Sequence, residues 1–147
     1  MKLYKMYLIV LLTLLTFVWY NGCSNERTYE FRQSIDQVVS IEILQTNGRD
    51  DYDVLKVIEE SDYIQFTDDI LKMQGGSCYP PTEGPGYYCV RVTYRDQWTE
   101  IFGNGEIERR SPNGFSLYGN FTFKNREEYM AFINKWVDAE EPLTEPT

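Results

Sequence analysis

The chain has 147 residues, enough for one ordinary domain, with 23 Asp and Glu against 14 Lys and Arg and a formal net charge of −9. A body this acidic repels nucleic acid and anionic lipid head groups, which excludes nucleic acid as a partner. The chain has no histidine, which excludes Ser–His and Cys–His nucleophile pairs. Without histidine or a Cys-x-x-Cys pair, we expect no zinc site.

The first 22 residues have the organisation of an export leader. Lys2 and Lys5 precede the apolar run Tyr7–Trp19, and Gly22-Cys23 follows. A short basic stretch, an apolar core and a small residue at the end are the parts of an export signal. We therefore expect residues 1–22 to be a leader that carries the body of the chain out of the cytoplasm.

Gly22-Cys23 resembles the cleavage site of small bacterial lipoproteins, in which the cysteine is lipidated and becomes the new N-terminus. The resemblance covers roughly the first 23 residues, and Tyr20 and Asn21 depart from the usual apolar and small residues. It implies lipid attachment at Cys23 and a body on the extracytoplasmic side of the cell membrane. The alternative is an uncleaved signal anchor, because a run of roughly 15 apolar residues can approach the roughly 20 of a spanning helix if lysines snorkel.

Two strands are predicted after a polar tether over residues 23–36. The stretch Gln37–Gln45 alternates, with Val39, Ile41 and Ile43 on one face, which predicts a strand. Asn47-Gly48 is typical of a turn. The apolar run Val54–Ile58 then predicts a second strand paired with the first.

The next element is an amphipathic helix that begins at Ser61 or Asp62 as N-cap. Its apolar stripe is formed by residues at helical spacing, with Ile64 and Leu71 widening it: Tyr63, Phe66, Ile70 and Met73. Gly75-Gly76 ends the helix.

An antiparallel meander follows, beginning with the alternating strand Tyr88–Tyr94. We expect a two-residue turn at Asp96-Gln97 that pairs Tyr94 with Thr99, because a three-residue loop would place Glu100 opposite Val92 on the apolar face. Asn104-Gly105 predicts the next hairpin. The last two strands are Glu106–Arg110 and Phe115–Phe123.

A final helix is predicted after Asn125, which has Glu128 three residues later as in a capping box. Its apolar stripe comprises Tyr129, Phe132, Ile133 and Trp136. The acidic tail, residues 139–147, is expected to be disordered. The sequence thus predicts one α+β domain over residues 37–138, an antiparallel sheet meander with two helices packed on one face.

Cys78 and Cys89 remain as an even pair if Cys23 is lipidated, and an oxidising compartment favours a disulfide between them. The bridge would close a loop of about a dozen residues and contribute roughly 3 kcal/mol. Two free thiols, one of them buried on the strand, are the alternative.

Carboxylates are the remaining side chains that could act in catalysis or bind a metal ion. An envelope hydrolase would need two converging carboxylates, but the pairs Glu59-Glu60 and Asp68-Asp69 are neighbours in sequence, whose side chains diverge on a helix. The spacing of Asp50, Asp51 and Asp53 does not match that of a calcium-binding loop. An acidic turn between two strands would have the same composition. We therefore expect no catalytic residue, metal or cofactor.

The better candidate is a binding surface in which aromatic side chains alternate with arginine, the composition of interface hot spots. In the expected register it comprises Arg91, Arg95, Trp98 and Phe102 on one sheet face, with Tyr79, Tyr87 and Tyr88 from the cysteine loop. Packing of Trp98 and Phe102 under a helix is the alternative.

The sequence therefore predicts an exported, membrane-anchored, non-catalytic binding module for a protein or a cell-envelope component. An immunity or inhibitor lipoprotein against a basic toxin or hydrolase is a second hypothesis, because the body is acidic. A carboxylate-based envelope hydrolase is a third.

Overall fold

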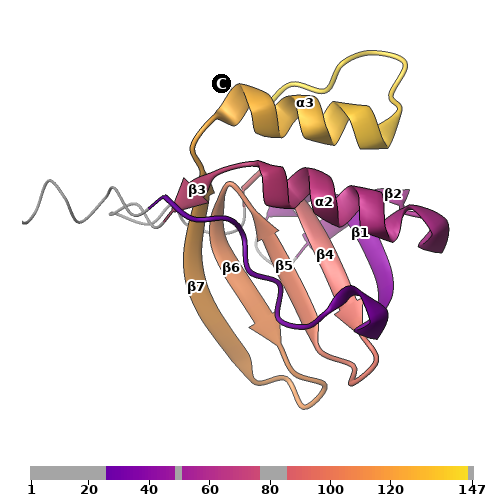
Figure 1. Cartoon of the computed structure of the whole chain (residues 1–147), viewed down its shortest axis with the longest axis vertical. Helices are drawn as coiled ribbons and strands as arrows, with labels where there is room; N and C mark the ends of the chain where they lie inside the picture. Colours follow the sequence, from indigo (N-terminus) through magenta and orange to yellow (C-terminus); the bar gives the residue numbers. More distant parts are fainter. Residues whose placement is uncertain (1–25, 49–50, 77–85, 146–147) are drawn as a thin grey trace, which may run out of the picture.

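The computed structural model describes residues 26–48, 51–76 and 86–145. In these residues seven strands form one antiparallel sheet in the order β2-β1-β4-β5-β6-β7-β3, with two α-helices (Figure 1), so the predicted α+β class is confirmed. The strands are β1 (Val38–Gly48), β2 (Asp51–Val57), β3 (Gly75–Gly76), β4 (Tyr88–Tyr94), β5 (Thr99–Gly103), β6 (Gly105–Arg110) and β7 (Ser116–Phe123). The helices are α2 (Tyr63–Lys72) and α3 (Arg126–Val137), with short 3₁₀ turns η1 (Ile35–Gln37) and η2 (Glu60–Asp62).

β1 pairs with β4 on one side and with β2 on the other, and the β1–β2 pairing is the one that the sequence predicts. Ile41 and Ile43 are fully buried in the main core, whereas Leu44 on the opposite face is buried in a small second cluster with Cys89 and Ile101. The sheet is therefore buried on both faces where β1, β4 and β5 lie side by side. The expectation that Val39 shares the buried face is wrong, because the β1–β4 register shifts between Val38 and Ser40 and leaves Val39 exposed.

The predicted register of β4 and β5 is also wrong, because the connection is a three-residue loop and not the expected two-residue turn. The Tyr94 amide donates to the Trp98 carbonyl, and Val92 lies opposite Glu100. Gln97 takes a left-handed conformation with φ of 65°, as the last residue of such a loop does. The shifted register moves Phe102 opposite Val90 and turns Glu100 into the core.

Both helices bury most of the stripes that the sequence predicts, although Trp136 of α3 is only half-buried. Tyr63, Phe66, Ile70 and Met73 of α2 and Tyr129, Phe132 and Ile133 of α3 belong to the same buried cluster as the core residues of β1, β4, β5 and β7. Ile64 and Leu71, expected to widen the α2 stripe, are exposed. Asn125 caps α3 as predicted, its Oδ1 accepting from the amides of Glu127 and Glu128.

The predicted tether is partly wrong, because its second half is folded. In Figure 1 the indigo segment crosses the sheet in front of β7, β6 and β5, and the Tyr29 ring is fully buried between Phe102 and Phe121. Arg27 forms a two-residue bridge with Gly75. Apolar packing and backbone pairing therefore order this segment from Arg27 onward.

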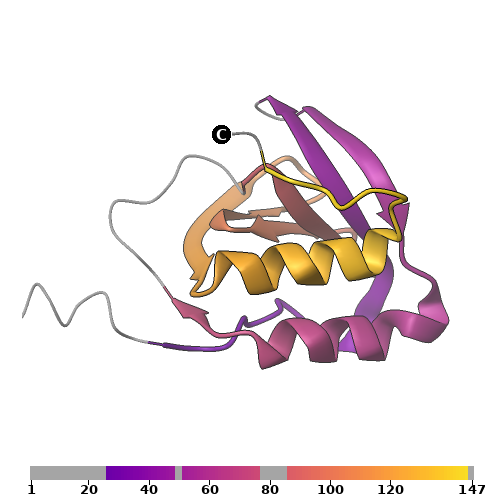
Figure 2. The ribbon, with the colours of Figure 1, turned by 90° about the horizontal axis from the view of Figure 1, so that it is seen from above.

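The acidic tail is also ordered up to Glu145, contrary to the prediction. Figure 2 shows the segment after α3 running back along that helix, where the Asn134 side chain bonds to both the amide and the carbonyl of Leu143. Leu143 packs against the core, and Glu145 pairs with Arg126. No helix of the described residues is long and apolar enough to cross a membrane, and the predicted leader with Cys23 lies outside them.

Asp69 joins the two helices. Its carboxylate accepts from Lys135 Nζ at 2.5 Å and from the Trp136 indole at 3.3 Å, and Lys72 lies at 3.4 Å. Burial raises the pKa of the Asp69 carboxyl, but the hydrogen bonds and charges of Lys135 and Lys72 outweigh it, so the net pKa lies below the ordinary value of 3.8.

We predict that replacing Asp69 by Asn destabilises the domain in full above about pH 4, and progressively less as the pH falls below that value. Because the folded pKa is below the unfolded one, the stabilisation is complete above the unfolded pKa and is lost as the pH falls through the folded pKa. Urea unfolding of wild type and D69N should show midpoints that differ at pH 6 and converge toward pH 2. A constant difference across this range would contradict the assignment.

Gly75 is required where β3 meets β7, because a Cβ there would lie 2.4 Å from the Thr122 carbonyl oxygen and 2.6 Å from the Phe121 ring. We predict that Gly75→Ala lowers the free energy of unfolding by about 1–3 kcal/mol through this overlap. Gly119→Ala on β7 is the control, since the nearest atom is 4.0 Å away. Equal urea midpoints of the two variants would show that the strand shifts to accept the methyl group.

Candidate functional site

The most concentrated polar cluster surrounds Glu100, a fully buried carboxylate on β5. Tyr29 donates to Oε1 at 2.5 Å, and Tyr94 donates to Oε2 at 2.5 Å. The Arg32 backbone amide donates to Oε2 at 2.9 Å, and Arg109 donates to Oε1 through Nε and Nη2 at 3.0 and 2.8 Å. One carboxylate therefore joins β4, β6 and the N-terminal segment.

This cluster holds the fold together and has no free group for a substrate. Every described buried side-chain nitrogen or oxygen has a hydrogen-bond partner. Burial, followed by the charge of Glu100 and the hydrogen bond to it, raises the pKa of both Tyr29 and Tyr94 far above the ordinary value of 10.0. Both phenols therefore stay protonated and act as donors.

A second polar group extends the cluster to the surface. Arg32 donates to Asp96 at 2.8 Å, and its guanidinium lies 4.3 Å from the centre of the Trp98 ring. Gln33 donates to the same Asp96 oxygen at 2.7 Å. The β4–β5 loop is thereby fastened to the N-terminal segment.

The predicted arginine–aromatic surface is not assembled as one patch. Phe102 cannot belong to it, because the true register turns its ring into the core, where it stacks on Tyr29 at 3.9 Å. Tyr88 is also buried, with its carbonyl accepting from Tyr129. Trp98 is half-buried under Arg32.

The remaining predicted surface residues lie apart. Arg91 lies on the opposite sheet face and pairs with Glu42 at 2.6 Å. Arg95 is exposed in the β4–β5 loop, and Tyr87 is half-buried with its hydroxyl accepting from Gln45. Tyr79 lies outside the described residues.

Cys89 is a buried free thiol in this structure, and burial raises its pKa to about 12. A thiol with so high a pKa is protonated and unreactive at neutral pH. Cys78 lies outside the described residues, so the Cys78–Cys89 bridge stays a prediction.

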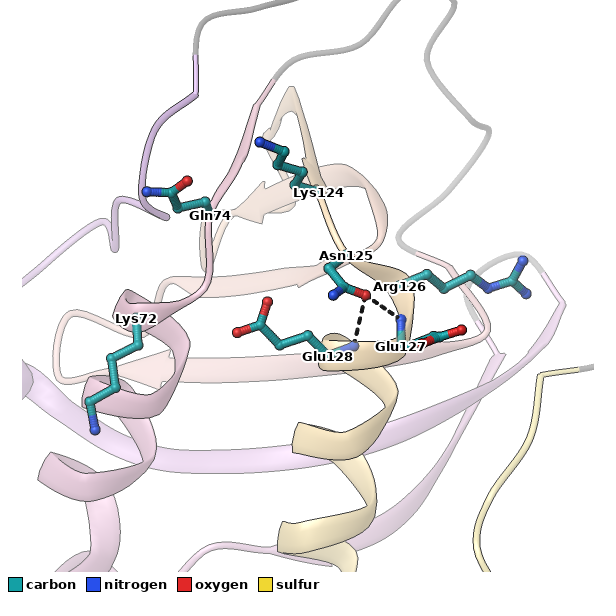
Figure 3. A pocket seen from close by; sticks show the side chains of 7 residues that line it. All are labelled: Lys72, Gln74, Lys124, Asn125, Arg126, Glu127 and Glu128. Carbon is teal, nitrogen blue, oxygen red and sulfur yellow. Dashed lines mark hydrogen bonds between the residues drawn. The ribbon is translucent and has the colours of Figure 1, made fainter.

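An open hollow of about 660 Å³ lies between the end of α2 and the start of α3 (Figure 3). Its cations are already paired, Lys72 with Asp69, Lys124 with Glu26 and Arg126 with Glu145. In Figure 3 the Arg126 side chain points away from Lys72 and Gln74, and the first amides of α3 bond to Asn125. Neither Glu59-Glu60 nor Asp68-Asp69 lines the hollow, and the described residues contain no acidic, Cys or His group suited to a metal ion.

The flank of α2 that faces away from Asp69 and α3 combines exposed apolar and acidic side chains. Ile64 is 66% exposed and Leu71 is 40% exposed, two turns apart, with exposed Asp68 between them. Glu60 precedes them on η2. We call these four residues the α2 flank.

Ile64 and Leu71 lie seven positions apart, a spacing that places them on the same side of the helix. The same spacing also fits the buried stripe to which the sequence analysis assigns them. Comparison with protein-family models, with curated proteins and with solved structures finds no match to the chain. The surface itself is therefore the basis for assigning a function.

We predict that Glu100→Gln lowers the free energy of unfolding by about 3 kcal/mol or more, because Arg109 keeps its charge and loses its anionic partner in the core. Chemical denaturation measures this loss. Glu42→Gln is the matched control on β1, since Glu42 keeps 18% of its side chain exposed whereas Glu100 has none exposed, and the Glu42–Arg91 pair should therefore contribute less. Equal losses in both variants would show that Glu100 does not organise the core.

Proposed function

We propose that this protein is an exported, membrane-anchored, non-catalytic binding module, and that the α2 flank docks a cationic protein or envelope component. The single observation that carries the proposal is the exposure of Ile64 and Leu71 on a helix whose other apolar side chains are buried. Burying such side chains against a partner contributes about 25 cal/mol per Å² of apolar surface.

The charge around these side chains selects the partner. From Glu59 to Asp69 the chain has five acidic residues and no basic one. Among the described residues, neither Glu60 nor Asp68 takes part in an ion pair, whereas Asp69 is paired with Lys72 and Lys135. A partner with an apolar side chain bordered by Lys or Arg complements this flank in both hydrophobicity and charge.

The proposal also concerns the position of the helices on the sheet and of the domain relative to the membrane. We propose that both helices cover the face of the sheet that carries Ile41, Val90 and Phe121, because their side chains share one buried cluster. The N-terminal segment joins the domain beside β3 and β7, at the edge opposite β2. Anchoring at Cys23, or by a retained leader, would hold that edge nearest the membrane.

The second candidate function is an immunity or inhibitor lipoprotein. The acidic α2 flank favours it, since an acidic surface with an apolar centre suits the basic surface of a toxin or hydrolase. The two functions use the same surface and differ in the identity of the partner.

A photo-crosslinking residue at position 64 tests the proposal in intact cells. We expect a crosslinked adduct with a basic protein or envelope component, and we expect Leu71→Ser to abolish it. Neutralising Glu60 or Asp68 should weaken binding roughly two- to fivefold for each charge removed.

The same crosslinker at Val57 is the control, because Val57 is exposed on β2, outside the α2 flank. Adducts of equal yield at positions 57 and 64, or an adduct unaffected by Leu71→Ser, would remove the α2 flank as the binding surface. Inhibition of the captured partner's own activity would distinguish an inhibitor from a simple binding module.

A further inference from the structure

The end of the β6–β7 hairpin carries three large exposed apolar side chains. Phe115 is 62% exposed, Leu117 is 49% exposed and Tyr118 is 60% exposed. We call these three residues the hairpin end. The turn is well ordered, with the amide of Ser111 donating to the Phe115 carbonyl and the amide of Phe115 donating to the Ser111 hydroxyl.

These side chains lie on both faces of the hairpin. Leu117 is paired with Arg109 and Tyr118 with Glu108, and consecutive strand residues point to opposite faces. A flat protein surface would cover one face only. The hydrocarbon boundary of a bilayer can enclose both, and aromatic side chains are favoured at that level.

The charge near the hairpin end permits this contact. Between Ile107 and Phe121 the chain has two basic residues, Arg109 and Arg110, and one acidic residue, Glu108. The Glu108 carboxylate is buried and accepts from Arg110 and from the Ser116 hydroxyl. The acidic excess of the chain therefore lies elsewhere and does not bring a free carboxylate to the lipid head groups.

The hairpin end is also within reach of the predicted anchor. Arg27 bonds to Gly75 and to the Asn120 carbonyl, and its guanidinium lies over the Phe121 ring. Arg27 follows Cys23 by four positions in the sequence, at most about 14 Å of extended chain. Leu117 lies four residues before Phe121 on β7, about 13 Å along the strand. One bilayer surface can therefore meet both points.

We propose that the hairpin end inserts into the lipid bilayer and is a second membrane contact of the domain; this rests on the proposed anchoring at the N-terminus. The occupant is a lipid surface of low negative charge, because the acidic body disfavours strongly anionic membranes. The anchor and the hairpin end together lay the β7 edge on the membrane. The opposite edge, with β2 and the beginning of α2, then points away from it.

Quenching by brominated lipid tests the insertion. Full-length Phe115→Trp is reconstituted in phosphatidylcholine vesicles, with and without bromine on the acyl chains, and the signal of the wild-type chain with its three tryptophans is subtracted. A side chain about 5–10 Å below the head groups should lose roughly half of its added fluorescence or more to the bromine atoms. Ile64→Trp on the α2 flank is the control and should not be quenched.

Flotation of the same vesicles separates this inference from the proposed anchoring. Protein that floats with the vesicles, with Phe115→Trp quenched and Ile64→Trp unquenched, supports insertion of the hairpin end. Protein that floats without quenching of Phe115→Trp overturns the insertion, leaves the anchor intact and assigns the hairpin end to a protein partner. Protein that does not float overturns both. Leu117→Trp repeats the measurement, and unchanged thermal midpoints verify that the variants fold.

Discussion

The fold depends on one buried carboxylate, that of Glu100, because five donors from three parts of the chain converge on it. A carboxylate without water is strongly unfavourable unless it is fully hydrogen-bonded and paired. Arg109 supplies the charge, and the two tyrosines and the Arg32 amide supply the remaining bonds. The requirement to satisfy this anion explains why residues 29–32 are packed on the sheet, and hence why the folded domain begins close to the predicted leader.

The buried apolar side chains form one large cluster, whereas the exposed ones form separate groups. The buried cluster runs from the N-terminal segment through the sheet to both helices. The large apolar side chains that remain exposed include two separate groups, the α2 flank and the hairpin end. The first lies among carboxylates, of which Glu60 and Asp68 take part in no ion pair with the described residues, whereas few carboxylates lie near the second. Two groups with such different surroundings suit two different partners, a cationic surface for one and lipid for the other.

Local patterns in the sequence predicted most of the fold. The stripes of both helices, the Asn125 cap and the β6–β7 hairpin follow from spacing that few other conformations satisfy. The predicted β4–β5 register is wrong because a carboxylate such as that of Glu100 is expected to avoid the core. Its partners Tyr29, Arg32 and Arg109 lie from 9 to 71 positions away, and no local pattern reveals such a cluster. The error then displaced Phe102 and with it the predicted binding surface.

If the chain is anchored at Cys23 as we propose, the ordered segment from Arg27 to Gln33 also limits how far the domain can extend from the membrane. A lipoprotein with a long disordered linker samples a wide volume above the bilayer, but here only a few residues separate the predicted attachment point from the fold. The height that the domain can reach is then close to its own width, about 29 Å for six spacings between seven strands. Any partner of this protein would have to come within that distance of the lipid surface.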